Sequence, residues 1–176
     1  IELDEFGSVR ACNLVQEEKL GLAIVNMEQF NIDKFESRVL AKEQLVYVVS
    51  KNHPMSGKKY MTIEDFKDEK LVMFNVDSVQ NELLKNRFDG LNISPHIIMR
   101  SSQLYTTLKF VDKGNCGCFL FSDMLPHFRE YVGIPLKPSI DVKIGIIWKK
   151  EKFLSHSAQL FIDFAMQYCS EKIITP

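Results

Sequence analysis

Short apolar runs alternate along the chain with segments in which apolar residues recur every three or four positions. The runs are rich in branched or aromatic residues, as is typical of strands that are covered on both faces of a sheet. The predicted strands are 22–25, 45–49, 71–74, 97–99, 118–121 and 142–148.

The segments between these runs predict amphipathic helices at 9–15, 79–88, 104–111 and 160–168. Asp77 or Ser78 is placed to cap the second of them, and Ser101 and Ser102 begin the third. Strands and helices that alternate in this way indicate an α/β fold with largely parallel sheets. Because a parallel sheet rarely begins with a strand as short as the opening IELDE, we expect a preceding strand and helix to be missing from this chain.

Composition narrows the class of protein. With 176 residues and 45% hydrophobic content, the chain is long enough for one domain or two small lobes. With a net charge of −1, the chain lacks the excess of positive charge that binding to nucleic acid requires. No apolar run approaches the roughly 20 residues of a membrane span, and the start is not a secretory signal. Four irregularly spaced cysteines suit free thiols, so we expect a soluble cytoplasmic domain.

Five short stretches carry a recognisable pattern in a fixed order: E-F-G-S (5–8), K-L-G-L-A-I-V (19–25), L-V-Y-V-V-S-K-N-H-P-M (45–55), T-I-E-D-F (62–66) and V-D-K-G-N-C-G (111–117). Of these, the strand that ends in His53-Pro54 is the most telling. In this order and spacing the chain resembles the effector-binding (co-inducer-binding) domain of LysR-type transcriptional regulators. Gly21 stands where that family often has Asp, and Cys116 stands where a second glycine is usual.

The resemblance implies a type 2 periplasmic-binding-protein-like fold, in which two Rossmann-like lobes are hinged by two crossover segments. Lobe I would combine residues 1–44 with 141–176, and lobe II would be residues 45–140. The family's first strand and helix would precede Ile1, as would the helix-turn-helix through which the full-length protein contacts promoter DNA.

Candidate ligand contacts follow from this layout. In such folds ligands bind at the carboxyl ends of strands, against helix starts whose free N–H groups attract anions. Ser8, Ser78, Ser101 and Ser102 lie at predicted helix starts and would offer donors to a small polar metabolite. Ordinary helix capping is the alternative role for each. Asp77 would repel an anion, so a neutral, zwitterionic or cationic effector also fits.

Two further residues end predicted strands. Asn26 follows the first strand, where a polar side chain would face the cleft, although a turn residue is the alternative. Phe121 ends the 118–121 strand and would cover the wall of the pocket; packing in the core is the alternative that we favour.

Catalytic, metal and redox readings find little support. Cys116 and Cys118 form a C-x-C pair without the second pair that structural zinc needs. His53 precedes a proline on a predicted turn, and no nucleophile or nucleotide-binding motif accompanies it. We therefore expect no enzyme, no cofactor and no metal.

Two functions remain. The first is the effector-sensing domain of a LysR-type regulator, with its ligand in the cleft between the lobes. The alternative is a solute-binding protein of a transport system with the same fold. For the regulator we expect self-association into a dimer or tetramer, with the apolar stripe Val9, Cys12 and Val15 as the candidate surface. Packing of that stripe on its own sheet is the competing interpretation.

Overall fold

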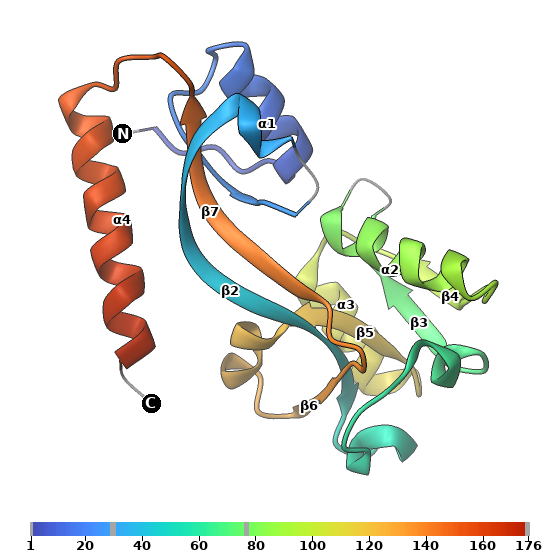
Figure 1. Ribbon diagram of the computed structural model, residues 1–176. Helices are drawn as coiled ribbons and strands as arrows, with labels where there is room; N and C mark the ends of the chain where they lie inside the picture. The colour runs from blue at the N-terminus through green and yellow to red at the C-terminus, as the bar shows by residue number, and fades with distance from the viewer. Residues whose placement is uncertain (1, 29–30, 76–77, 175–176) are drawn as a thin grey trace. The chain divides into compact units, whose positions relative to one another are not determined.

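The computed structural model describes residues 2–28, 31–75 and 78–174 (Figure 1). The chain divides into two compact units, 1–42 with 142–176 and 43–141. Strand β2 (Phe35–Ser50) leads from the first unit into the second, and β7 (Asp141–Lys149) leads back. The α/β fold in two lobes is as predicted.

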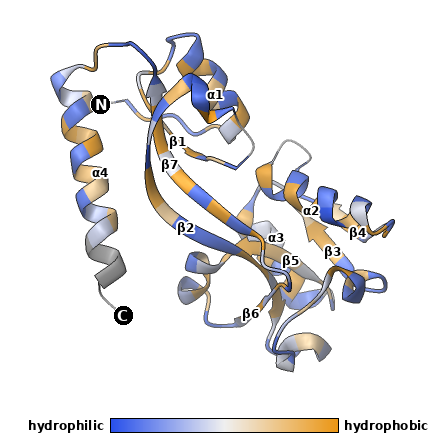
Figure 2. Ribbon diagram, in the orientation of Figure 1, coloured by the Kyte–Doolittle hydropathy of each residue, from blue (hydrophilic) through white to orange (hydrophobic). Residues whose placement is uncertain are grey.

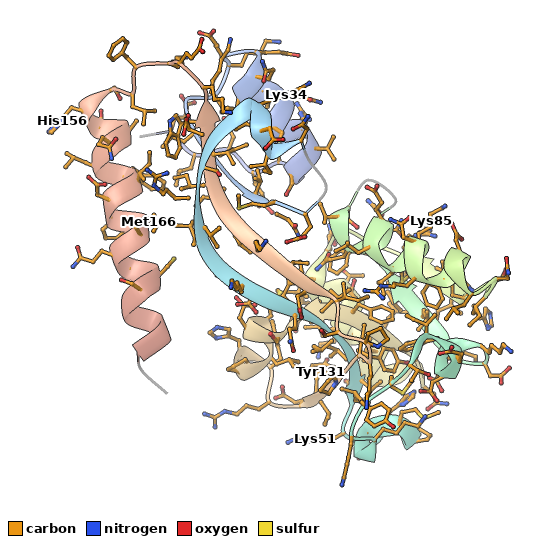
Figure 3. All side chains as sticks on the ribbon, in the orientation of Figure 1. Lys34, Lys51, Lys85, Tyr131, His156 and Met166 are labelled. Carbon is orange, nitrogen blue, oxygen red and sulfur yellow. The ribbon has the colours of Figure 1, made fainter. Side chains whose placement is uncertain are left out.

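The first unit is a small sheet with a helix on each face. Besides parts of β2 and β7, it contains α1 (Ser8–Gln16), β1 (Ala23–Asn26), the 3-10 turn η1 (Ile32–Lys34) and α4 (His156–Ile174). Strand β7 lies between β1 and β2. Successive side chains of a strand point to opposite faces. Accordingly, Ile147 packs with the α1 cluster and Ile146 with the α4 cluster, which includes Met166 (Figure 3).

The apolar stripe of α1 is part of this core. Cys12 is 4% exposed and Val15 is fully buried, and both pack with Val25 of β1. Only Val9 is substantially exposed. The prediction that this stripe is a self-association surface is therefore wrong, because its two central side chains are already covered by the unit's own sheet.

The second unit is a larger sheet, also covered on both faces. Its elements are the second half of β2, the 3-10 turns η2 (Pro54–Gly57), η3 (Ile63–Phe66) and η4 (Ser122–His127), β3 (Lys70–Met73), α2 (Val79–Gly90), β4 (His96–Arg100), α3 (Leu104–Lys113), β5 (Gly117–Phe121) and β6 (Tyr131–Pro135). Residues of α2 and η3 pack with Tyr47 and Phe119 on one face, and residues of α3 pack with Val48 and Cys118 on the other.

Two local contacts fix this unit. A Cβ at Gly117 would lie 2.3 Å from the ring of Tyr47, so the backbone of β5 can approach that ring only because residue 117 is glycine. On the other face the hydroxyl of Tyr131, labelled in Figure 3, donates to the carbonyl of Leu108 at 3.0 Å and ties β6 to α3.

Parallel pairing is concentrated in the second unit. There β3 lies between β4 and β5 and is parallel to both. The pairs β1–β7, β2–β5 and β2–β6 are antiparallel. The sheet of the second unit is therefore mixed, because β5 runs antiparallel to β2 and parallel to β3. Figure 2 shows that the two long strands, β2 and β7, each combine hydrophilic and hydrophobic stretches.

In the described part of the chain, no helix is long and apolar enough to cross a membrane.

Candidate functional site

Two of the predicted site residues meet in the first unit. Ser8 is the first residue of α1, and Asn26 is the last residue of β1. The backbone N–H of Asn26 donates to Ser8 Oγ at 3.1 Å. Ser8 does not cap its own helix, because Gly7 occupies the N-cap position and α1 has no side-chain cap. The carboxyl end of β1 and the start of α1 thus lie side by side, as the site prediction requires.

The side chain of Asn26 stabilises a turn and is also a candidate ligand contact. Its Oδ1 accepts from the backbone N–H of Glu28 at 3.0 Å, which is the turn role that we had considered. The residue is only 5% exposed. Its Nδ2 is buried, and it has no hydrogen-bond partner among the residues that the structure describes.

A polar cluster in the second unit surrounds the start of α2. Ser78 is the N-cap, and its hydroxyl oxygen accepts from the N–H of Asn81 at 3.2 Å. Asn81 Oδ1 in turn accepts from Arg100 Nη1 at 2.6 Å. Arg100 ends β4, and its Nη1 also donates to the carbonyl of Phe74, just beyond β3, at 3.3 Å. A positive charge therefore lies at the carboxyl ends of two parallel strands, beside a helix start.

Helix α3 starts where its apolar stripe was predicted to start, but neither of the two serines is its N-cap. The helix begins at Leu104 with Gln103 as its N-cap, so Ser101 and Ser102 precede it rather than begin it. The Ser101 N–H donates to the carbonyl of Met73 at 3.1 Å, and its hydroxyl accepts from the N–H of Gln103 at 3.1 Å. Ser101 thereby lies at the carboxyl end of β3, while Ser102 is exposed.

At the end of β5 the aromatic side chain is mainly structural. Phe121 is partly buried and packs against the core of the second unit, which agrees with the role that we favoured. The next residue is held by Glu43, whose Oε2 accepts from Ser122 Oγ at 2.9 Å and from the N–H of Asp123 at 3.2 Å. Asp77 lies outside the described residues.

The sequence did not indicate Arg100, Asn81, Ser122 or Glu43. For Arg100 a usable pattern was present, since a charged residue ends the apolar run directly before Ser101-Ser102. Asn81 and Glu43 could not be found in this way, because their roles depend on partners 19 and 79 residues away.

A cavity of about 420 Å³ lies elsewhere in the first unit. It is lined by the N-terminal segment, residues 20–24 and the start of α4. None of the predicted site residues lines it. The polar groups at the strand ends are the better candidate site, because a polar ligand needs placed donors and acceptors rather than volume alone.

Cys12, Cys116 and Cys118 are buried free thiols, and Cys169 is a free thiol that is partly exposed. Burial raises the pKa of Cys12 to about 11, and it raises the pKa of Cys116 and Cys118 as well. Thiolates are the reactive form, so these environments disfavour redox chemistry. No group of side chains that could hold a metal ion occurs within the described residues.

The His-Pro motif has a structural role. His53 is 5% exposed, and its Nδ1 accepts from the backbone N–H of Met55 at 3.2 Å. Its Nε2 lies 3.7 Å from Glu69 Oε2, which also accepts from the hydroxyl of Tyr47 at 3.0 Å. Burial, followed by the Glu69 charge, raises the pKa of Tyr47, so the phenol stays protonated. The histidine thus anchors the turn after β2.

Solved structures share the fold of this chain. Over 94% of its length the chain matches the effector-binding domain of QuiR in complex with shikimate, with a TM-score of 0.78, 23% identity and 79% of that chain covered. The regulatory domain of CcmR from Synechocystis PCC6803, in complex with 2-PG, gives a TM-score of 0.82 at 18% identity, covering 93% of this chain and 80% of that one. These likenesses confirm the predicted fold class.

Sequence comparison identifies the family. The HTH-type transcriptional regulator YwbI of Bacillus subtilis (strain 168) is 26% identical over 95% of this chain and 56% of its own length. The transcriptional dual regulator GltC of the same organism is 24% identical over 89% and 53%. The chain thus spans about half the length of these regulators. The model of the LysR substrate binding domain matches residues 1–170, so the chain belongs to the LysR substrate binding domain family.

Proposed function

We propose that this effector-binding domain senses a small polar metabolite and that binding controls the DNA-binding activity of a longer transcriptional regulator. The observation that carries the proposal is the polar cluster at the carboxyl ends of β3 and β4, where Ser78, Arg100 and Ser101 come together. Placed donors at strand ends and helix starts are the usual means by which α/β folds bind small polar ligands.

The residues proposed to contact the ligand are those with a donor to spare. Ser78 and Ser101 use their hydroxyl oxygens as acceptors for backbone N–H groups, which leaves each hydroxyl hydrogen free to donate. Capping and ligand binding therefore coexist. Ser8 and Asn26 offer donors in the first unit, and exposed Ser102 adds a hydroxyl in the second. Phe121 would contribute an apolar wall.

The charge of the cluster bears on the effector. Arg100 provides a guanidinium, which binds carboxylates and phosphates well. An anionic or zwitterionic metabolite is therefore favoured over a cationic one. That the ligand lies in the cleft between the lobes, as the resemblance implies, stays a prediction.

Partners follow from the family and from the charge. DNA contact is proposed for another part of the full-length regulator, since a net charge of −1 gives this chain no phosphate-binding surface. Self-association into a dimer or tetramer also remains a proposal, and its surface must differ from the buried stripe of α1. The curated relatives are transcriptional regulators, so the alternative of a transport protein is not favoured.

The test is a thermal-shift screen of the chain against a library of small polar metabolites. A ligand present at 100 times its Kd should raise the free energy of unfolding by about 2.7 kcal/mol. A hit is then titrated against the S78A/S101A variant, with S94A at an exposed serine as the matched control. Binding should weaken by about 0.5–1.5 kcal/mol for each neutral hydrogen bond lost.

Because Ser78 caps α2, the melting temperature of each variant must be measured beside its affinity. If no metabolite stabilises the chain, the proposed sensing function is contradicted. If a metabolite binds the double variant as tightly as the parent chain, the assignment of the site to this cluster is contradicted.

A further inference from the structure

The guanidinium of Arg100 is held by the fold at one nitrogen. Its Nη1 donates to Asn81 Oδ1 at 2.6 Å and to the carbonyl of Phe74 at 3.3 Å. An Nη nitrogen carries two hydrogens, so these two bonds use both. Within the described part of the chain, Nε and Nη2 donate to no acceptor, and the residue is exposed. The N–H groups of these two nitrogens therefore remain available to a ligand.

The two acceptors that hold Nη1 are themselves fixed. Asn81 lies in the first turn of α2 and is only 6% exposed, and its backbone N–H donates to Ser78 Oγ at 3.2 Å. Rotating its side-chain amide by half a turn would set the NH2 group against the guanidinium, donor against donor, so Oδ1 must face Arg100. The other acceptor belongs to the backbone directly after β3. The guanidinium of Arg100 is therefore placed before a ligand arrives.

This placement selects one edge of the guanidinium. Arginine binds a carboxylate or a phosphate best through two parallel N–H···O bonds. The edge formed by Nη1 and Nη2 cannot make such a pair, because both hydrogens of Nη1 are already used. The edge formed by Nε and Nη2 can make it. An arginine without such anchors would have to be ordered during binding, which lowers the affinity.

We infer that Asn81 is a positioning residue of the sensing site, which holds Arg100 so that its Nε and Nη2 edge binds two oxygens of one oxyanion group of the effector. Asn81 acts through the guanidinium and does not touch the ligand. The inference rests on the proposed function, because it adds a residue to the same site. The competing role for Asn81 is a purely structural tie between α2 and the end of β4.

The test uses benzoate as the probe and benzamide as its neutral counterpart of the same shape. Both are titrated into the nitrogen-15-labelled chain up to tens of millimolar at constant ionic strength. The backbone N–H signals of Ser101 and Ser102, which every variant retains, report binding. We expect benzoate to shift these signals to saturation and benzamide to leave them in place. N81A should weaken benzoate binding about two- to tenfold, the usual effect of having to order one long side chain.

A double-mutant cycle separates positioning from structure. R100K should weaken benzoate binding about tenfold or more, because an ammonium group has no edge with two parallel donors. In the R100K background, N81A should cause no further loss, since Asn81 acts only through the guanidinium. Two exposed residues of α2 give the matched controls, and N86A and R87K should both bind benzoate as the parent chain does.

N81D is the second variant, which keeps the test decisive if N81A fails to fold. Its carboxylate retains an acceptor for Arg100 Nη1, so the melting temperature should not fall. Its negative charge compensates the guanidinium, so benzoate binding should weaken at least as much as in N81A. A purely structural tie predicts the opposite pattern, in which N81D binds benzoate as tightly as the parent chain.

Three outcomes would overturn the inference. The first is that benzoate does not bind the parent chain or that benzamide binds equally well. The second is that N81A weakens binding as much in the R100K background as in the parent chain. The third is that N81D binds benzoate as the parent chain does. In each case a metabolite from the thermal-shift screen that depends on Ser78 and Ser101 would leave the sensing function intact. Failure of that screen, by contrast, would remove the function itself.

Discussion

The two units share one construction, but they treat the polar groups at their helix starts differently. In the second unit Ser78 caps α2, and the hydroxyl of Ser101 accepts a hydrogen bond from the N–H of Gln103, the N-cap of α3. The side chain of Asn81 accepts a hydrogen bond from the Arg100 guanidinium. In the first unit α1 has no side-chain cap, and Asn26 Nδ2 has no partner among the described residues. Each unit nevertheless keeps one buried polar atom without a partner among the described residues, Asn26 Nδ2 in the first and Thr107 Oγ1 in the second. The two units therefore differ in how α1 and α2 start, rather than in how completely their buried polar groups are paired.

The largest expected effect is a difference in the free energy of unfolding between variants of two buried asparagines. N81A removes the acceptor of a 2.6 Å bond from the Arg100 guanidinium and should lower the free energy of unfolding by about 1.5–3 kcal/mol. N26A removes one bond to a backbone N–H together with an unpaired donor, so it should lower that energy by less than about 1 kcal/mol. Urea unfolding of both variants measures the difference. A loss in N26A as large as in N81A would mean that Asn26 is satisfied in the free domain.

The second effect concerns the cap of α2. S78A leaves the N–H of Asn81 without its side-chain acceptor and should lower the free energy of unfolding by about 0.5–2 kcal/mol. S102A, at an exposed serine beside the same strand ends, should change it by less than about 0.5 kcal/mol. Equal losses in the two variants would argue against Ser78 as the cap.

A third, pH-dependent effect tests another helix start of the second unit. The hydrogen bond from Lys58, followed by that from the Thr62 N–H, holds the pKa of Asp65 below its usual range. A lowered pKa stabilises the fold above the unfolded value of about 3.9 and loses this effect as the pH falls below it. D65N should therefore be less stable than the parent chain by about 0.5–1 kcal/mol at neutral pH.

This gap should narrow as the pH falls below about 4, because Asp65 becomes protonated first in the unfolded chain and, below its lowered pKa, in the folded chain as well. Unfolding curves at several pH values give the measurement, with exposed D68N as the control. A gap that stays constant down to low pH would show that the carboxylate charge of Asp65 does not contribute.

The smallest expected effect is an increase in the free energy of unfolding. Gly7 has φ −61° and ψ 147°, which any residue adopts, and a Cβ there would have no atom within 4 Å. G7S would give α1 the cap that it lacks and should raise the free energy of unfolding by a few tenths of a kcal/mol. A loss of stability instead would show that the start of α1 is not open to a new side chain.

The sequence predicted the elements whose apolar residues follow a regular pattern. Continuous apolar runs predicted β3, β5 and β7, and the stripe from Val79 to Phe88 predicted α2 with Ser78 as its cap. The first half of β2 was missed, because its exposed side chains include charges and interrupt the apolar run. Strand β6 was missed because glycine and proline break its pattern.

The sequence predicted which elements carry the candidate site residues, but not which of those residues contact one another. Serines near helix starts and Asn26 at a strand end could be read from the sequence alone. The bond between Ser8 and Asn26 joins residues 18 apart, and the bond between Arg100 and Asn81 joins residues 19 apart. Such pairs depend on how strands and helices pack, which periodicity within one element does not determine. The lack of a partner for Asn26 Nδ2 among the described residues likewise depends on this packing.

The most direct test of the account follows the side-chain amide of Asn26 by NMR in the nitrogen-15-labelled chain. Its NH2 signals are assigned by their loss in N26D, and those of Asn31 serve as the internal reference. On addition of a metabolite that stabilises the chain in the thermal-shift screen, we predict that the Asn26 NH2 signals shift while those of exposed Asn31 stay in place. If the ligand binds and the Asn26 signals do not move, the account of ligand recognition by the first unit is wrong.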